Sequence, residues 1–217
     1  ISLDQFCTSP ASKGSPHSGQ NFGGLAVTFA KPERENCDGY AYDPENPSQH
    51  IIDMSENEIE VPEDYTREEL RQDLLCYTSP VLKEDLVLTG DMTAELYISS
   101  DAPDTDFVVR VTDVDENGRS IKLADGLLSA RYRNGFARSE FLQEGEIVCL
   151  KIRTTKLSNC FRKGHRIRVT VTSSAKNFIF PNSNTREGFA SARTVVAHNR
   201  VYHGGLHASR LTVRVEP

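Results

Sequence analysis

The 217-residue sequence contains no tryptophan, and no apolar run approaches the roughly 20 residues of a membrane-spanning helix. It also lacks an excess of positive charge, because 25 lysines and arginines face 31 aspartates and glutamates, for a formal net charge of −6. A nucleic-acid-binding protein needs a basic face to neutralise phosphates, and an anionic membrane attracts basic surfaces. We therefore expect neither nucleic acid nor a membrane as a partner.

The five cysteines are odd in number and contain no Cys-x-x-Cys pair. This spacing indicates neither a disulfide framework nor a zinc knuckle. A reducing, cytoplasmic location is therefore expected. The chain begins at Ile1 and not at a methionine, which leaves secretion open and indicates a fragment of a longer polypeptide.

Alternation of apolar and polar residues dominates the chain from residue 85 onward. A period of two is typical of strands with one face in a core and the other in water. In the most regular example, Ile167, Val169 and Val171 are expected to face inward and the polar residues between them outward. Strands are predicted at about residues 85–90, 92–99, 105–114, 119–124, 126–133, 146–154, 166–173 and 209–215. Such a series favours an antiparallel β-sandwich, either a jelly roll or an immunoglobulin-like Greek key.

One helix is predicted upstream of these strands. Thr66-Arg-Glu-Glu69 has the composition of a capping box, and leucines follow it at helical spacing. The helix should run for two to three turns and end before Ser79-Pro80. Residues 31–57 are rich in proline, aspartate and asparagine and are predicted to form a long loop, which in a compact domain is usually functional or disordered.

Asp113, Asp115, Asn117 and Gly118 match the first half of a calcium-binding EF-hand loop. The bidentate carboxylate that such a loop needs at its twelfth position would fall on Ala124. The flanking residues also alternate as strands and do not show helical periodicity. We therefore predict a metal-free hairpin turn, in which Asn-Gly supplies the required positive φ angles.

A second acidic cluster, Asp101, Asp104 and Asp106, precedes a predicted strand. Carboxylates in such a loop are suitable ligands for a structural calcium ion. The same residue type also ends strands and caps turns, and we favour that role. No metal site is therefore predicted here.

The last 20 residues hold three of the six histidines, His198, His203 and His207. Gly204 and Gly205 exclude a helix that would place two of them on one face, so we expect hydrogen-bonded or solvated loop histidines and no zinc site. The sequence also lacks a Gly-x-Ser-x-Gly nucleophile turn, since the segment 14–19 has the wrong spacing. No catalytic residue and no cofactor are expected in this chain.

Five segments, in fixed order, resemble the C-terminal domain of the X-Pro dipeptidyl-peptidase and cocaine-esterase (CocE/NonD) family of serine hydrolases. They are residues 75–111, 113–120, 125–133, 164–174 and 182–185. The resemblance favours an all-β, jelly-roll β-sandwich, galactose-binding-domain-like, with one short helix and long loops. It also implies that residues 1–217 form a single such domain, a fragment without the upstream α/β-hydrolase and helical cap domains.

The resemblance further implies an accessory role in a serine hydrolase. In the parent enzyme a serine attacks an ester or X-Pro peptide carbonyl with histidine as general base, and the whole triad lies upstream. The implied partners are the hydrolase and cap domains of the same polypeptide, a peptide or ester substrate, and a second copy if the protein is a homo-oligomer. The alternatives are a stand-alone carbohydrate- or ligand-binding jelly roll and a structural module. The absence of tryptophan counts against sugar stacking, for which Tyr97, Tyr132 and Phe136 are weak candidates.

In relatives, the loop after a Tyr-Asp-Pro-x-x-Pro motif forms one wall of the substrate pocket. The motif here is Tyr42-Asp-Pro-Glu-Asn-Pro47, so the corresponding loop is residues 48–54. Relatives usually carry a Gly-Gly pair in this loop, and this chain does not. The resemblance assigns the wall to His50, Ile51, Ile52 and Met54. In a plainer interpretation, Ile51 and Ile52 only cover the edge of the sandwich.

Overall fold

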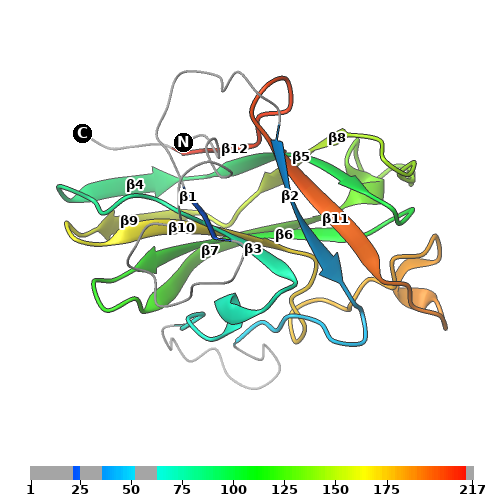
Figure 1. The fold of residues 1–217 in the computed structure, drawn as a ribbon, viewed down its shortest axis with the longest axis horizontal. Helices are drawn as coiled ribbons and strands as arrows, with labels where there is room; N and C mark the ends of the chain where they lie inside the picture. Colours follow the sequence, from blue (N-terminus) through cyan, green and yellow to red (C-terminus); the bar gives the residue numbers. More distant parts are fainter. Residues whose placement is uncertain (1–21, 25–35, 52–62, 214–217) are drawn as a thin grey trace.

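The computed structural model describes residues 22–24, 36–51 and 63–213, and their regular structure is almost entirely β (Figure 1). The strands are β1 (Phe22–Gly24), β2 (Asn36–Tyr42), β3 (Leu74–Thr78), β4 (Leu86–Gly90), β5 (Thr93–Ser100), β6 (Asp106–Val114), β7 (Ser120–Ser129), β8 (Val148–Arg153), β9 (Leu157–Phe161), β10 (Arg166–Thr172), β11 (Ala197–His203) and β12 (Arg210–Thr212). Three single turns of 3-10 helix accompany them: η1 (Glu68–Leu70), η2 (Ala130–Tyr132) and η3 (Gly188–Ala190). The predicted all-β sandwich is confirmed.

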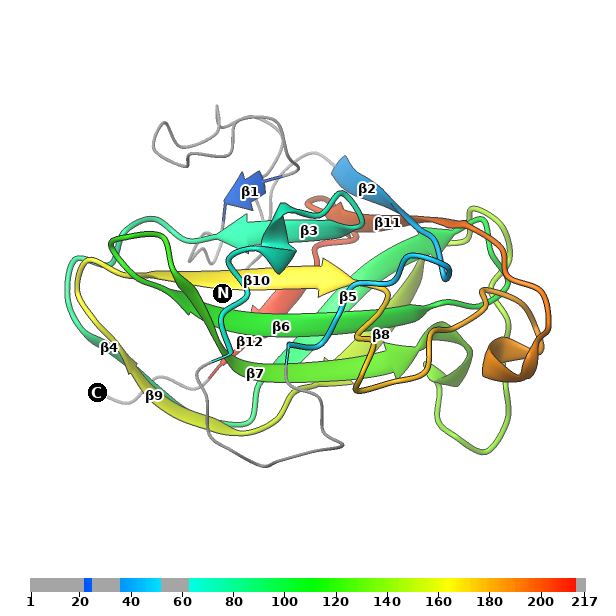
Figure 2. The same ribbon diagram turned by 90° about the horizontal axis from the view of Figure 1, so that it is seen from below.

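Two sheets form the sandwich, and their strands cross steeply in Figure 1. One sheet has the order β1-β3-β10-β6-β7. In the second sheet, one edge of β5 pairs with β8. The opposite edge of β5 pairs with β12 near the start of the strand and with β11 near its end. Strand β2 then pairs with the free edge of β11. Among the described strands, β4 and β9 pair only with each other and extend one end of the molecule as an arm (Figure 2).

The core lies between the two sheets. In β5 the alternate residues Ala94, Leu96 and Ile98 are buried, as the alternation predicts. From the opposite sheet the predicted inward face of β10, which includes Val169 and Val171, is buried against them. Burying one aliphatic side chain of this size stabilises a fold by about 1.5–3 kcal/mol. The described cysteines, Cys37, Cys76, Cys149 and Cys160, are all free thiols.

The predicted helix after Thr66 is wrong. Only the single 3-10 turn η1 forms, and the next residue, Arg71, is extended with ψ 157°. The Thr66 hydroxyl does not cap a helix, because it donates to Asp64 Oδ1 and accepts the Ser120 N–H. Of the leucines that suggest a helix, Leu70 lies in η1, whereas Leu74 and Leu75 lie in β3, where four consecutive residues are buried and the strand pairs with β10. Pairing inside a sheet thus overrides local helix signals.

Several strand predictions also need correction. The predicted loop 31–57 contains β2, and strands β3, β9 and β11 were not predicted at all. The two strands predicted at 119–124 and 126–133 are one strand, β7, with a register shift opposite Val111 and Thr112. The last strand is shorter than predicted, and residues 214–217 lie outside the described part.

The turn between β6 and β7 is a hairpin, as predicted, but of the Asn117-Gly118 pair only Gly118 has a positive φ. Gly118 has φ +84°, and its N–H donates to the Asp115 carbonyl at 3.0 Å. Asp115 Oδ1 accepts hydrogen bonds from the N–H groups of Asn117 and Arg119, at 2.8 and 2.9 Å. Asp113 Oδ1 lies 2.9 Å from His165 Nδ1. The Oδ1 atoms of Asp113 and Asp115, which an EF-hand loop would offer to calcium, therefore already make contacts within the fold.

We expect that calcium does not raise the melting temperature of the purified protein. A calcium site with a Kd of roughly 10 µM would add about 2.7 kcal/mol of stability at about 1 mM calcium, which is 100 times that Kd. Thermal unfolding with and without calcium measures this directly. An increase of several degrees that EDTA reverses would contradict the prediction and imply a carboxylate supplied from another segment.

Candidate functional site

A layer of chain, residues 43–51 and 63–73, crosses the outer face of the β3-β10-β6-β7 sheet (Figure 2). This layer corrects the expectation that the polar side of β10 faces water, because Thr170 and Thr172 are buried. Arg110, opposite Thr170 on β6, is also buried, and its Cζ lies 4.0 Å from the ring centroid of Tyr65. The outer face of the sheet is therefore a polar interior surface.

Glu69 anchors the second part of this layer to the sheet. Its Oε1 accepts a hydrogen bond from Ser120 Oγ at 2.8 Å, and its Oε2 pairs with Arg168 of β10. Thr112 Oγ1 lies 3.5 Å from the same Oε1. Burial raises the pKa of the neighbouring Cys76 thiol, and the charge of Glu69 adds to the rise. Cys76 thus remains a thiol at neutral pH and is unsuited to be a nucleophile.

His50 anchors the first part of the layer. Its Nε2 lies 2.9 Å from Lys122 Nζ, and 3.6 Å from both Glu63 Oε2 and Asp125 Oδ2. Lys122 Nζ also contacts Glu63 at 2.7 Å and Asp125 at 3.2 Å. Burial acts to raise the pKa of Asp125, but the hydrogen bond with His50 and the Lys122 charge hold it below its usual range. The lysine therefore stays between two carboxylates, which limits the cost of burying its charge.

The backbone around His50 is tied to the segment that follows β10. The His50 N–H donates to the Lys176 carbonyl at 2.7 Å, and the Lys176 N–H donates to the Ser48 carbonyl at 2.9 Å. The Ser48 N–H donates to Ser174 Oγ at 2.8 Å. On the side-chain level, the His50 ring stacks on Phe178 with centroids 5.0 Å apart and an interplanar angle of 27°.

The resemblance-based wall residues separate into two kinds in the structure. His50 is buried, with 3% of its surface exposed. Ile51 exposes 45% of its surface, while its N–H donates to Tyr65 Oη at 3.1 Å. Ile52 and Met54 lie outside the described residues. In this loop, the polar side chain of His50 is thus buried in the domain, and the apolar side chain of the next residue, Ile51, is exposed at the surface.

The partners of His50 could not be identified from the sequence. Lys122 and Asp125 lie on a strand with alternating polarity, where charged residues are normally solvated, and Glu63 lies in a strongly acidic stretch. Phe178 follows a run of polar residues and has no periodicity of its own. No local signal links these residues with the loop, because their contacts with it depend on the fold of the whole sheet.

The acidic cluster before β6 has a structural role. Asp104 is fully buried, and its Oδ2 lies 2.7 Å from Arg131 Nε and accepts a hydrogen bond from Asn182 Nδ2 at 2.7 Å. Asp106 Oδ1 accepts from the same Asn182 Nδ2 at 2.9 Å. Burial raises the pKa of Asp106, and Asp104 adds to this effect. In the described part of the chain, no three His, Cys, Asp or Glu side chains are grouped as metal ligands.

The three C-terminal histidines are not brought together. His198 Nδ1 lies 2.7 Å from Asp101 Oδ2 at the surface. His203 is buried, with Nε2 3.2 Å from Asp38 Oδ2. The expectation of loop histidines is wrong for these two, since both lie on β11. The His207 ring packs edge-on against Tyr97, with centroids 5.3 Å apart.

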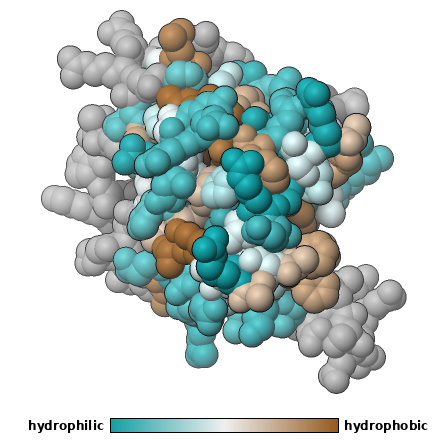
Figure 3. All heavy atoms as spheres, turned by 90° about the vertical axis from the view of Figure 1, so that its right-hand side faces the viewer, coloured by the Kyte–Doolittle hydropathy of each residue, from teal (hydrophilic) through white to brown (hydrophobic). Residues whose placement is uncertain are grey.

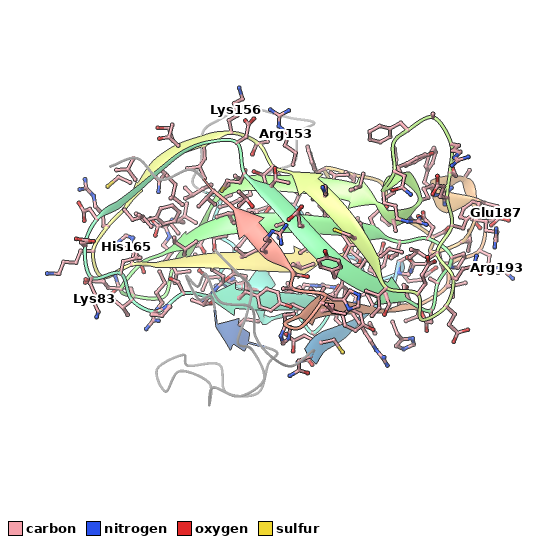
Figure 4. The ribbon with its side chains drawn as sticks, turned by 90° about the horizontal axis from the view of Figure 1, so that it is seen from above. Lys83, Arg153, Lys156, His165, Glu187 and Arg193 are labelled. Atoms are coloured by element: carbon pink, nitrogen blue, oxygen red, sulfur yellow. The ribbon has the colours of Figure 1, made fainter. Side chains whose placement is uncertain are left out.

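The segment 174–196 carries an exposed apolar surface at one end of the molecule. Figure 4 places Glu187 and Arg193 at this end and His165 at the opposite end. Phe180 and Phe189 are 81% and 77% exposed and stack on each other with centroids 6.1 Å apart. Figure 3 looks onto this end and shows hydrophobic side chains between polar ones. Val195 and Val196 of the same segment are also exposed, which is typical of a surface that meets another domain.

A family model for the X-Pro dipeptidyl-peptidase C-terminal non-catalytic domain matches residues 20–212. Cocaine esterase of Rhodococcus sp. (strain MB1 Bresler) is 34% identical over 209 residues, which cover 93% of this chain and 36% of that protein. A putative serine esterase of Mycobacterium bovis is 33% identical over 161 residues, which cover 65% and 24% respectively.

Two solved structures share the fold. An aminopeptidase from the marine sediment archaeon Thaumarchaeota archaeon has a TM-score of 0.80 at 24% identity, over 87% of this chain and 35% of its own. An alpha-amino acid ester hydrolase has a TM-score of 0.76 at 22% identity, over 88% and 33%.

The chain spans 36% or less of the length of the curated relatives. None of the helical turns among the described residues has the length and apolar character of a membrane-spanning helix. The matches do not favour a stand-alone sugar-binding module. With a family model over almost its whole length and a relative at 34% identity, the chain belongs to the family of X-Pro dipeptidyl-peptidase C-terminal non-catalytic domains, found in CocE/NonD-type hydrolases.

Proposed function

We propose that this domain packs on the α/β-hydrolase and helical cap domains of one polypeptide and closes the substrate pocket with the loop 48–54. The observation that carries the proposal is the position of Ile51. It is held outward on a loop whose neighbouring residue, His50, is buried in a network of charges and hydrogen bonds. A pocket wall needs this combination, because a side chain contributes to specificity only when its backbone is held in place.

The chemistry of the intact enzyme is acyl transfer by a serine of the catalytic domain. The names of relatives, two esterases and one aminopeptidase, support hydrolysis of an ester or of a peptide bond. The nucleophile is assigned to the catalytic domain because the matched family is one of non-catalytic domains, and among the described residues the thiol of Cys76 is buried and stays protonated. The contribution of this chain is to exclude water and to hold the acyl or leaving group in place.

Ile51 determines what kind of group the wall accepts. A half-exposed isoleucine offers apolar surface and no hydrogen-bond partner, so a charged or strongly polar substituent would lose its hydration without compensation. The proposed wall therefore favours a substrate with an apolar group at this place. The exposed surface formed by Phe180, Phe189, Val195 and Val196 would contact the neighbouring domain.

We expect the substitution Ile51→Ser in the full-length enzyme to change substrate preference without unfolding the protein. Stability should change by no more than about 0.5 kcal/mol, as for other surface substitutions. The kcat/KM ratio between two p-nitrophenyl esters that differ in acyl size should change because an apolar wall is lost. Expressed as a free energy of discrimination between the two esters, the expected change is about 1–3 kcal/mol. Steady-state kinetics and thermal unfolding measure the two effects.

Leu206→Ser is the matched control. Leu206 is 81% exposed and lies in the loop between β11 and β12, red in Figure 1, across the molecule from the cyan segment that carries Ile51. The control should leave the kcat/KM ratio unchanged. If Ile51→Ser also left it unchanged, the pocket assignment would be wrong. If Ile51→Ser unfolded the domain, Ile51 would belong to the sandwich edge.

A further inference from the structure

Phe178, and not His50, is the exposed ring of the stacked pair that they form. One face of the His50 imidazole is covered by Phe178, and the edge of the Tyr65 ring lies 6.4 Å from it, centroid to centroid, at 77°. The Nε2 atom of His50 is occupied in the Lys122 cluster. A substrate group therefore has no access to His50. Phe178 remains 44% exposed, with one face on His50.

The backbone holds Phe178 in this position from both sides. The N–H groups of Phe178 and Ile179 both donate to the Ala175 carbonyl, at 3.0 and 2.9 Å, which closes a tight turn. Asn177 adopts φ +80° within that turn, a conformation that asparagine tolerates better than most residues. Its Nδ2 donates to the His50 carbonyl at 3.4 Å. Hydrogen bonds therefore join the turn that carries Phe178 to the loop that carries His50.

We propose that Phe178 is a second substrate-contacting side chain of the pocket wall and that His50 is the residue that positions it. This inference rests on the proposed function, in which Ile51 faces the pocket. Ile51 and Phe178 then supply apolar side chains to the wall from two segments that are more than 120 residues apart in the chain and are joined by the hydrogen bond from Asn177 to His50. An aromatic ring in the wall favours a substrate with an aromatic acyl or leaving group, because aromatic pairs gain offset-stacked or edge-to-face contacts.

The test compares two esters in the full-length enzyme, p-nitrophenyl phenylacetate and p-nitrophenyl acetate. With Phe178→Ala, the kcat/KM for the phenylacetate should fall by about three- to tenfold relative to the acetate. Phe178→Tyr keeps the ring and should keep the ratio, while Leu206→Ala is the control for loss of an exposed apolar side chain elsewhere.

The outcomes separate this inference from the proposed function. If Ile51→Ser changes the ratio and Phe178→Ala does not, Phe178 is not part of the wall, although the proposed function stands. If neither variant changes the ratio, both fail. If Phe178→Ala lowers the melting temperature and slows both esters equally, the ring has only a structural role, and the inference is overturned.

The role of His50 is tested with His50→Gln alone and combined with Phe178→Ala. If His50 acts through Phe178, the double variant should discriminate between the esters no worse than Phe178→Ala alone, because the ring that His50 positions is already missing. Additive losses of selectivity would show that His50 acts by another route. A selectivity in His50→Gln equal to that of the unmodified enzyme would also overturn the positioning role.

Discussion

Replacing Asp104 by alanine should destabilise the protein by about 3–5 kcal/mol, since removal of one partner leaves a buried charge without compensation. Asp104 is fully buried. Its carboxylate accepts hydrogen bonds from Arg131 Nε at 2.7 Å, from the Arg131 backbone N–H at 2.9 Å and from the side chain of Asn182. The same contacts join the β5–β6 connection to the turn after β7 and to the segment after β10. Denaturant unfolding of the purified protein measures the loss.

Asp101→Ala is the matched control, because it changes the same residue type in the same acidic cluster. The Asp101 side chain is 40% exposed and pairs with the exposed His198. Surface ion pairs contribute about 0–1 kcal/mol, so the control should be close to neutral. Equal losses in the two variants would show that burial of Asp104 has no special importance.

The substitution Glu69→Gln should also cost about 3–5 kcal/mol, although glutamine has the same shape as glutamate. The amide oxygen can still accept the Ser120 hydroxyl, but Arg168 loses its carboxylate partner within a buried layer. The measurement is again the free energy of unfolding from denaturant titration, compared with the unmodified protein.

A double substitution, Glu69→Leu with Arg168→Met, provides the control for this second prediction. Removal of both charges leaves no unpaired ion, and apolar replacements of buried ion pairs are often neutral or stabilising. The double variant should therefore lose less stability than the sum of Glu69→Leu and Arg168→Met measured singly. Additive losses would mean that the two side chains do not act as a pair, and the network around Glu69 would need another explanation.

Most of the central strands could be predicted from alternation alone. In β5, β6 and β10 the sequence keeps the period of two, because one face of each strand packs in the apolar core and the other face is mostly polar, although in β6 and β10 that polar face is buried as well. The strands that were missed have weaker patterns. Strand β3 is buried on both faces and reads as an apolar run, and β2 lies at a sheet edge among turn-forming residues. Periodicity cannot identify strands of these two kinds.

The wrong helix has a specific physical cause. The capping box at Thr66 predicts a helix that includes Leu74 and Leu75, whereas each of these leucines is buried on a different side of β3. Glu69, which a capping box would direct to the helix start, instead binds Arg168 on the sheet. The local signal for a helix is real but small, and the long-range ion pair and the strand pairing with β10 outweigh it.

For the candidate site, the loop was proposed from the resemblance and stays a prediction, and the sequence did not indicate which residues support it. The resemblance indicated residues 48–54, and the structure describes His50 and Ile51 of them. The support comes from Lys122, 72 residues away, and from the turn that contains Asn177, 127 residues away. Without paired strands that bring these segments to one face, nothing in the sequence connects them.

The bond between the Ser48 N–H and Ser174 Oγ has a consequence for synthesis of the chain. The two residues are 126 positions apart, so the loop cannot form this contact until β10 and the turn after it have been synthesised. At the usual translation rates of about 5–20 residues per second, that delay is about 6–25 s. During this time the loop and β2 are released from the ribosome without their partners. The loop that carries Ile51 therefore cannot dock until β10 and its turn have been made, and β2 waits longer still, because its partner β11 is made later. Until then, the apolar side chain of Ile51 is available to chaperones.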